Sequence, residues 1–192
     1  PTGSVGANTG CSWYAQDSGL AIVSPFNLIQ AGNTWYLYAD TGAGTWNIFS
    51  QVTIATTTLS AGQWYHVACV RDSTNIRLYI NGVQVGTASI GAASIWQNTV
   101  RNLYLFGAWQ NTAGSTGLNG YVSNYRLVKG TCLYPGGTTF TVPTTPLTNI
   151  TNTSLLTCQS SQFIDNSTNA FTITTAGNTQ PVPANPFGMT AW

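Results

Sequence analysis

The sequence contains no glutamate and a single histidine, His66. Its only carboxylate side chains are those of Asp17, Asp40, Asp72 and Asp165. Enzyme chemistry at neutral pH depends mostly on paired carboxylates, on histidines, and on nucleophiles or metals that such groups activate or hold. This inventory leaves few ways to build a catalytic site, and we therefore predict that the chain is not an enzyme.

Charge of either sign is also scarce. Charged residues make up 5% of the chain, whereas an ordinary soluble domain has about 25%. The net charge is +1, and the five basic residues do not cluster in sequence. Because nucleic-acid binding needs clustered Lys and Arg, we expect no nucleic-acid partner. No apolar run reaches the roughly 18 residues of a membrane span, so we expect no span.

The four cysteines form no Cys-x-x-Cys pair, and with one histidine they argue against a structural zinc site. We predict no cofactor. Cys69, in the strand-like run His-Val-Ala-Cys-Val, is predicted to be a buried thiol. Cys11, Cys132 and Cys158 leave one disulfide open if the protein is extracellular, and the sequence does not decide the pairing.

Short runs of Val, Ile, Tyr, Trp, Phe and Thr alternate with Gly, Asn, Ser and Pro clusters, and no helical period competes with them. The strongest local signal is Asn81-Gly82, which is typical of a two-residue hairpin turn. The pattern predicts an all-β fold, an antiparallel two-sheet jelly-roll sandwich. The predicted strands span residues 12–15, 20–24, 34–39, 46–55, 63–71, 77–80, 83–88, 102–108, 120–127, 155–159 and 170–175.

The strand over residues 63–71 is apolar on both faces, which is expected of a central strand covered on both sides. Trp64 and His66 share one of these faces. We therefore predict that Trp64 belongs to the core, and that His66 is a structural histidine in or beside the core. A catalytic histidine would need a partner and a nearby nucleophile, and the neighbouring sequence suggests neither.

Three stretches resemble a known family. Residues 59–86, with Trp-x-His-Val followed by Leu-Tyr-Ile-Asn-Gly, resemble the central hairpin of laminin-G-like, concanavalin A-like domains. Residues 118–134 resemble a later strand of the same fold. Residues 139–174, closing with Pro186-Phe187, resemble a branch of this family that is common in bacteriophage virion proteins. The resemblance implies one laminin-G-like β-sandwich domain over residues 1–187, followed by a tail at 188–192.

Two features depart from the family pattern. The usual first strand, with its Phe-x-hydrophobic-Glu-Phe-Trp motif, is missing, and we expect an upstream segment or another polypeptide to supply it. Calcium-binding members use acidic side chains near the sheet rim, whereas this chain has Ser123-Asn124 at one such strand. Asp40 and Asp72 are the remaining calcium candidates, and backbone carbonyls would have to provide most of the oxygens. The alternative is that both aspartates form turns with their own backbone.

The glucanases of this superfold place two carboxylates on one strand, because the acid and the nucleophile must lie about 5 Å apart. Here the nearest aspartates in sequence are Asp17 and Asp40. The strand motif is therefore absent, which agrees with a non-enzymatic function.

Sugar binding needs little charge, because aromatic faces and amide side chains can provide the contacts. Two Trp-Gln-Asn triplets in or beside predicted loops are the candidate glycan-binding residues. The alternative is that their indoles pack on the core or on a neighbouring subunit. The candidates are Trp96, Gln97, Asn98, Trp109, Gln110 and Asn111.

The sequence thus predicts a virion-surface, extracellular component that attaches to host glycans. Its partners would be other virion proteins or copies of itself. The alternative is a purely structural decoration protein or fibre subunit without a glycan ligand.

Overall fold

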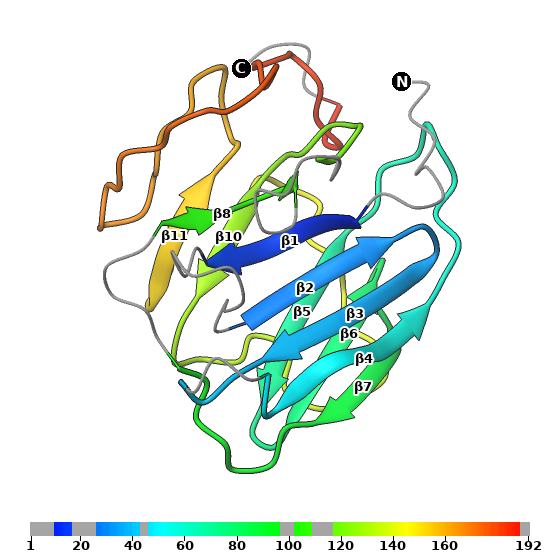
Figure 1. Cartoon of the computed structure of the whole chain (residues 1–192). Helices are drawn as coiled ribbons and strands as arrows, with labels where there is room; N and C mark the ends of the chain where they lie inside the picture. Colours follow the sequence, from blue (N-terminus) through cyan, green and yellow to red (C-terminus); the bar gives the residue numbers. More distant parts are fainter. Residues whose placement is uncertain (1–9, 17–25, 43–45, 97–101, 109–116, 189–192) are drawn as a thin grey trace. The chain divides into compact units, whose positions relative to one another are not determined.

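The computed structural model describes residues 10–16, 26–42, 46–96, 102–108 and 117–188. These residues form eleven strands and no helix, and every strand pairing is antiparallel (Figure 1). The chain divides into two compact units, residues 1–120 with 136–139 and residues 121–135 with 140–192. The strands are β1 Gly10–Gln16, β2 Phe26–Ala31, β3 Thr34–Ala39, β4 Phe49–Thr56, β5 Val67–Asp72, β6 Asn75–Ile80, β7 Val83–Ser89, β8 Leu103–Tyr104, β9 Gly107–Ala108, β10 Tyr125–Val128 and β11 Thr153–Thr157.

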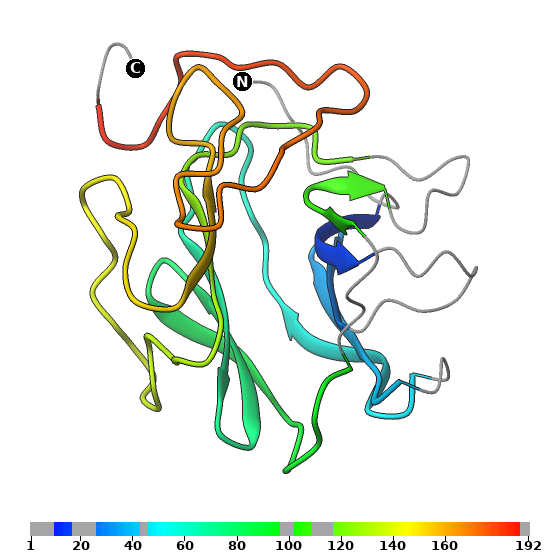
Figure 2. The ribbon, with the colours of Figure 1, turned by 90° about the vertical axis from the view of Figure 1, so that its left-hand side faces the viewer.

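The first unit is a two-layer sandwich. One sheet has the strand order β4-β3-β2-β1-β8, with β9 also paired to β1, and the other has the order β5-β6-β7. Figure 2 shows the two sheets as separate layers. One apolar cluster joins side chains of both sheets, among them Leu37 from β3, Phe49 from β4 and Leu78 from β6. The predicted all-β antiparallel sandwich is confirmed.

Period-two alternation decides which side chains enter this core. In β3, Trp35, Leu37 and Ala39 belong to the core cluster and none is exposed to solvent. Leu28 of β2 lies opposite Leu37 in the ladder and joins the same cluster. Trp13 of β1 adds a ring contact to Trp35 with a centroid distance of 5.2 Å. Large apolar side chains on one face of the sheet thus fill the space between the layers.

The two sheets lie very close together where Gly86 of β7 meets Ile54 of β4. A Cβ atom added to Gly86 of β7 would lie 1.8 Å from the backbone oxygen of Ile54 in β4. Real Cβ atoms do not approach a backbone oxygen so closely, so only glycine fits at this position. The close approach explains why a glycine interrupts an otherwise good strand.

The hairpin at Asn81-Gly82 is confirmed. Both residues have positive φ, 50° and 76°, and Ile80 pairs directly with Val83 across the turn. The turn also holds the segment before β5, because the N–H of His66 donates to Oδ1 of Asn81 at 2.9 Å. The N–H of Asn81 in turn donates to the carbonyl of His66 at 2.8 Å. His66 thus has a structural role through its backbone.

These contacts correct the prediction for residues 63–71. Because the backbone of His66 bonds to the turn, the ladder with β6 starts only at Val67. Trp64 lies outside the strand with 40% of its surface exposed, so its predicted core position is wrong. The central strand of the three-stranded sheet is β6, and among the described ladders β5 pairs with β6 alone.

Other strand predictions also differ from the structure. The strand predicted over 102–108 is divided into β8 and β9, and the one predicted over 120–127 starts only at Tyr125. Residues 170–175 form no strand, because no described segment pairs with them. The strand β2 was not predicted, since Asn27 and Gln30 interrupt its apolar pattern. The prediction for 20–24 falls outside the described residues. The single domain over 1–187 stays a prediction.

The second unit contains the antiparallel pair β10-β11 and a long irregular segment. Asp165 is its main organising residue. The carboxylate accepts hydrogen bonds from the N–H groups of Leu156, Ser167 and Phe171 and from the hydroxyl of Ser167, at 2.8–3.0 Å. Burial raises the pKa of Asp165, but these hydrogen bonds outweigh it and hold the pKa below the usual value.

Cys69 and Cys158 are thiols without a disulfide. Cys69 is half-buried in β5, and burial raises the pKa of its thiol to about 12. Burial also raises the pKa of Cys158, against a lowering contribution from Thr157. The side chain of Cys11 lies outside the described part. Among the described residues, no helix has the length and apolar character that crossing a bilayer requires.

Candidate functional site

The clearest candidate for a ligand-facing residue is Trp96, which is partly buried at the end of the segment that follows β7. Its backbone N–H donates to the backbone carbonyl of Asp40 at 2.8 Å. Its indole lies against Gly42, since a Cβ added there would be 3.2 Å from Cδ1 and 3.3 Å from Cγ of the ring. The tryptophan is therefore held in place from both its backbone and its ring.

The loop that holds Trp96 begins directly after β3 and is organised by Asp40. This aspartate is fully buried, and its carboxylate accepts from the N–H of Gly42 at 2.9 Å and from that of Trp46 at 3.2 Å. Thr41 and Asn47 close the loop with two reciprocal hydrogen bonds at 3.0 and 2.7 Å. Both side chains are exposed, so a hydroxyl and an amide lie on the loop that contacts Trp96.

A second indole, Trp46, belongs to the same loop. Its ring makes an edge-on contact with Tyr38 of β3 at a centroid distance of 5.0 Å. Tyr38 is buried, and burial raises its pKa, with a smaller contribution from Tyr36. The phenol therefore stays neutral at physiological pH. Its cross-strand partner is Asn27, a fully buried amide whose Nδ2 and Oδ1 have no hydrogen-bond partner among the residues that the structure describes.

Of the predicted glycan-binding residues, the structure describes Trp96 alone. Gln97, Asn98, Trp109, Gln110 and Asn111 lie outside the described residues, so their role stays a prediction. Sequence reasoning did not identify the loop 40–47 as the surface that contacts Trp96. Its signal was the sequence Asp-Thr-Gly after a strand, which is typical of a turn closed by an aspartate.

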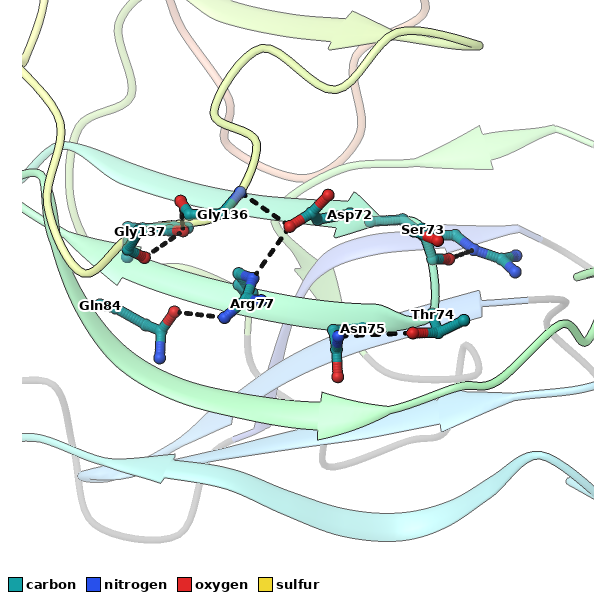
Figure 3. A network of polar contacts seen from close by, with 10 residues as sticks. Asp72, Ser73, Thr74, Asn75, Arg77, Gln84, Gly136 and Gly137 are labelled. Carbon is teal, nitrogen blue, oxygen red and sulfur yellow. Dashed lines mark hydrogen bonds and ion pairs between the residues drawn. The ribbon is translucent and has the colours of Figure 1, made fainter.

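The carboxylates of the two calcium candidates, Asp40 and Asp72, accept hydrogen bonds from backbone N–H groups. Oδ2 of Asp72 accepts from the N–H of Gly136 at 2.7 Å and from Nε of Arg77 at 3.3 Å, and Arg77 also donates to Gln84 (Figure 3). Tyr79 donates to the carbonyls of Gly136 and Gly137. These contacts fasten residues 136–139 to the outer face of the β5-β6-β7 sheet.

Asp40 likewise bonds to the N–H groups of its own loop, which is the arrangement expected of a turn-forming aspartate. Within the described part of the chain, no three His, Cys, Asp or Glu side chains gather as a metal-binding group. Directly before β10, Oδ1 of Asn124 accepts from the N–H of Leu147 and from Nε2 of Gln159.

Comparison with protein families fits this architecture. Residues 6–132 match a laminin G-type family model described as the concanavalin A-like lectin/glucanases superfamily. The chain belongs to this family. The match spans the whole described sandwich, the loop 40–47 and Trp96. Comparisons with curated proteins and with solved structures gave no match.

The superfamily includes both lectins and glucanases. The positions of the described carboxylates can be compared with those that a glucanase needs. Asp40, Asp72 and Asp165 each accept hydrogen bonds from backbone N–H groups, and each lies in a different loop or strand end. A retaining glycosidase needs two carboxyl groups about 5 Å apart, one of them protonated for acid catalysis.

Proposed function

We propose that the chain is a non-catalytic carbohydrate-recognition domain on the exterior of a virion, where it attaches to host-surface glycans. The observation that carries the proposal is the position of Trp96. Trp96 is partly exposed, and its indole lies against Gly42. Its backbone N–H donates to the carbonyl of Asp40. An aromatic ring that is already fixed loses little conformational freedom on binding.

The surroundings of Trp96 suit a sugar better than a charged ligand. The loop offers the exposed hydroxyl of Thr41 and the exposed amide of Asn47, and its one carboxylate is buried and bonded to backbone. Binding sites for neutral ligands combine apolar or aromatic surface with a few oriented polar groups. Individual contacts of this kind are weak, and many copies on one particle would add avidity.

The virion location rests on different support. Residues 118–187 resemble a branch of the family found in bacteriophage virion proteins, and charged residues make up only 5% of the chain. The absence of a catalytic role is supported by the lack of glutamate and by the structural engagement of Asp40, Asp72 and Asp165.

The test is to display the full chain on a multivalent particle and to measure binding to a glycan panel and to host cells. The informative variant is Trp96→Ala, and Trp64→Ala is the matched control because Trp64 is exposed but lies outside the candidate site. We expect Trp96→Ala to weaken binding at least ~10-fold, equivalent to about 1.4 kcal/mol, and Trp64→Ala to leave it unchanged.

A second variant, Gly42→Ala, keeps the indole but disrupts the surface against which it packs. The added Cβ would lie 3.2 Å from Cδ1 of Trp96, and the backbone φ of 121° is one that L side chains rarely adopt. We expect it to weaken binding as well. If the particle that displays the unmodified chain binds no glycan, the glycan proposal fails. A structural decoration protein is then the remaining function.

A further inference from the structure

Residues 171–176 of the second unit have the sequence of a strand but no partner strand. The run Phe-Thr-Ile-Thr-Thr-Ala alternates apolar and polar side chains and is rich in β-branched residues, which favour strands. The structure shows it without a turn or bend and outside every ladder. Gly177, with φ of 63°, ends the run. It is therefore an extended segment of strand-forming sequence that is left unpaired.

One edge of this segment is already used. The N–H of Phe171 donates to Oδ2 of Asp165 at 3.0 Å. In an extended chain the backbone groups of successive residues point to opposite edges. The N–H and C=O groups of Thr172 and Thr174 therefore point away from the edge that contacts Asp165. Within the described part of the chain, neither threonine makes a hydrogen bond, and both are exposed.

Exposed apolar side chains lie on this segment and next to Asp165. Phe171 is 58% exposed and Ile164 is 44% exposed. Together with Phe163 and Ile173 they line a hollow of ≈ 350 Å³ in the second unit. Unpaired backbone next to exposed apolar side chains is the combination that promotes strand addition.

We propose that residues 172–174 pair antiparallel with the same residues of a second copy of this chain, around a two-fold axis at Ile173. The segment suits its own copy because Thr172 and Thr174 flank Ile173 symmetrically. A two-fold interface requires such self-complementarity. In this register Thr172 of one copy forms the hydrogen-bonded pair with Thr174 of the other. Ile173 faces Ile173 in the closer, non-hydrogen-bonded pair.

This register leaves the contact between Phe171 and Asp165 intact, since only the opposite edge is used. Charge does not oppose it either. Residues 166–192 contain no Asp, Glu, Lys, Arg or His, so the edge lacks the charged residues that usually protect edge strands from pairing. The first proline after the segment is Pro181, which lies beyond the paired residues. The dimer would double the valency of the glycan-binding loop without depending on glycan binding.

The test is sedimentation velocity of the full chain over concentrations from ~10 μM to ~1 mM, because a short strand pair gives a small and weak interface. We expect the sedimentation coefficient to rise with concentration. Ile173→Lys places like charges opposite each other and should keep the chain monomeric. Gln180→Lys adds the same charge at an exposed position outside the segment and should dimerise like the wild type.

Thr174→Pro removes the N–H that the pairing uses and should also abolish the concentration dependence. Thermal unfolding verifies that each variant is folded. Amide exchange at Thr172 and Thr174 reads out the edge directly, and we expect it to slow as concentration rises. A wild type that stays monomeric throughout overturns the proposal. So does a dimer in which these two amides exchange at an unchanged rate or Ile173→Lys has no effect.

Discussion

The two units of this chain are stabilised in different ways. The first unit has an apolar core cluster that joins two sheets, with Trp35, Leu37 and Leu78 fully buried. In the second unit, the irregular segments are held by side chains that bond to backbone, above all Asp165 and Asn124. The comparison shows how a chain with few charges can order long loops with Asp, Asn and Ser.

A large effect is expected at the contact between the two sheets of the first unit. Gly86→Ala places a Cβ 1.8 Å from the backbone oxygen of Ile54, so the strands β7 and β4 must move apart. We expect a loss of about 3 kcal/mol in the free energy of unfolding, measured with urea. Gly120→Ala is the control, because its Cβ would meet only Cγ of Leu118 at 3.8 Å. Equal effects of the two variants would contradict this packing.

The next effect concerns the second unit. Asp165→Asn keeps the shape of the side chain but removes the charge that accepts hydrogen bonds from Leu156, Ser167 and Phe171. Hydrogen bonds to charged groups are stronger than neutral ones, and we expect a loss of about 2 kcal/mol. Hydrogen exchange at the amides of Leu156 and Phe171 should accelerate. An unchanged unfolding free energy would show that the carboxylate does not organise this unit.

The lowered pKa of Asp165 makes the free energy of unfolding depend on pH. Its folded pKa lies below the ordinary value of 3.8, so the stabilisation is complete above 3.8 and is lost as pH falls through the folded pKa. Urea unfolding between about pH 5 and about pH 2 should show a steeper loss for the wild type than for Asp165→Asn. Parallel pH profiles for the two proteins would count against a depressed pKa.

The smallest effect is expected at Trp64, which lies outside β5 and is 40% exposed. Trp64→Ala should cost less than about 1 kcal/mol, whereas Trp35→Ala, which opens a cavity in the core, should cost about 3–5 kcal/mol. Chemical denaturation of both variants makes the comparison. A large loss for Trp64→Ala would restore the core position that the sequence favours.

Local patterns predicted much of the sandwich. The hairpin at Asn81-Gly82 and the strand β3 follow from turn chemistry and alternation, which are properties of neighbouring residues. The late start of β5 could not be read in the same way, because it depends on Asn81 bonding to His66 across the sequence. The segment 170–175 has strand propensity, but a strand also needs a partner, and local sequence does not specify one.

Some features of the candidate site can also be predicted from local sequence, whereas others depend on the fold. Trp96 was found from its residue type and its neighbours, and the family follows from sequence. Its seat on Gly42 and the engagement of Asp40 and Asp72 with backbone depend on residues that meet only in the fold. Such contacts have no local signal beyond a strand that ends in Asp-Thr-Gly.

The most direct test of the central claim is to titrate the ¹⁵N-labelled chain with the glycan that binds best in the panel and to follow the indole N–H signals. We predict that the Trp96 signal shifts in a saturable way, while that of Trp35, fully buried in the core, stays in place. Trp64 serves as the exposed reference and should not shift. Saturable binding that leaves Trp96 unchanged, or that moves Trp64 instead, would contradict the proposed site.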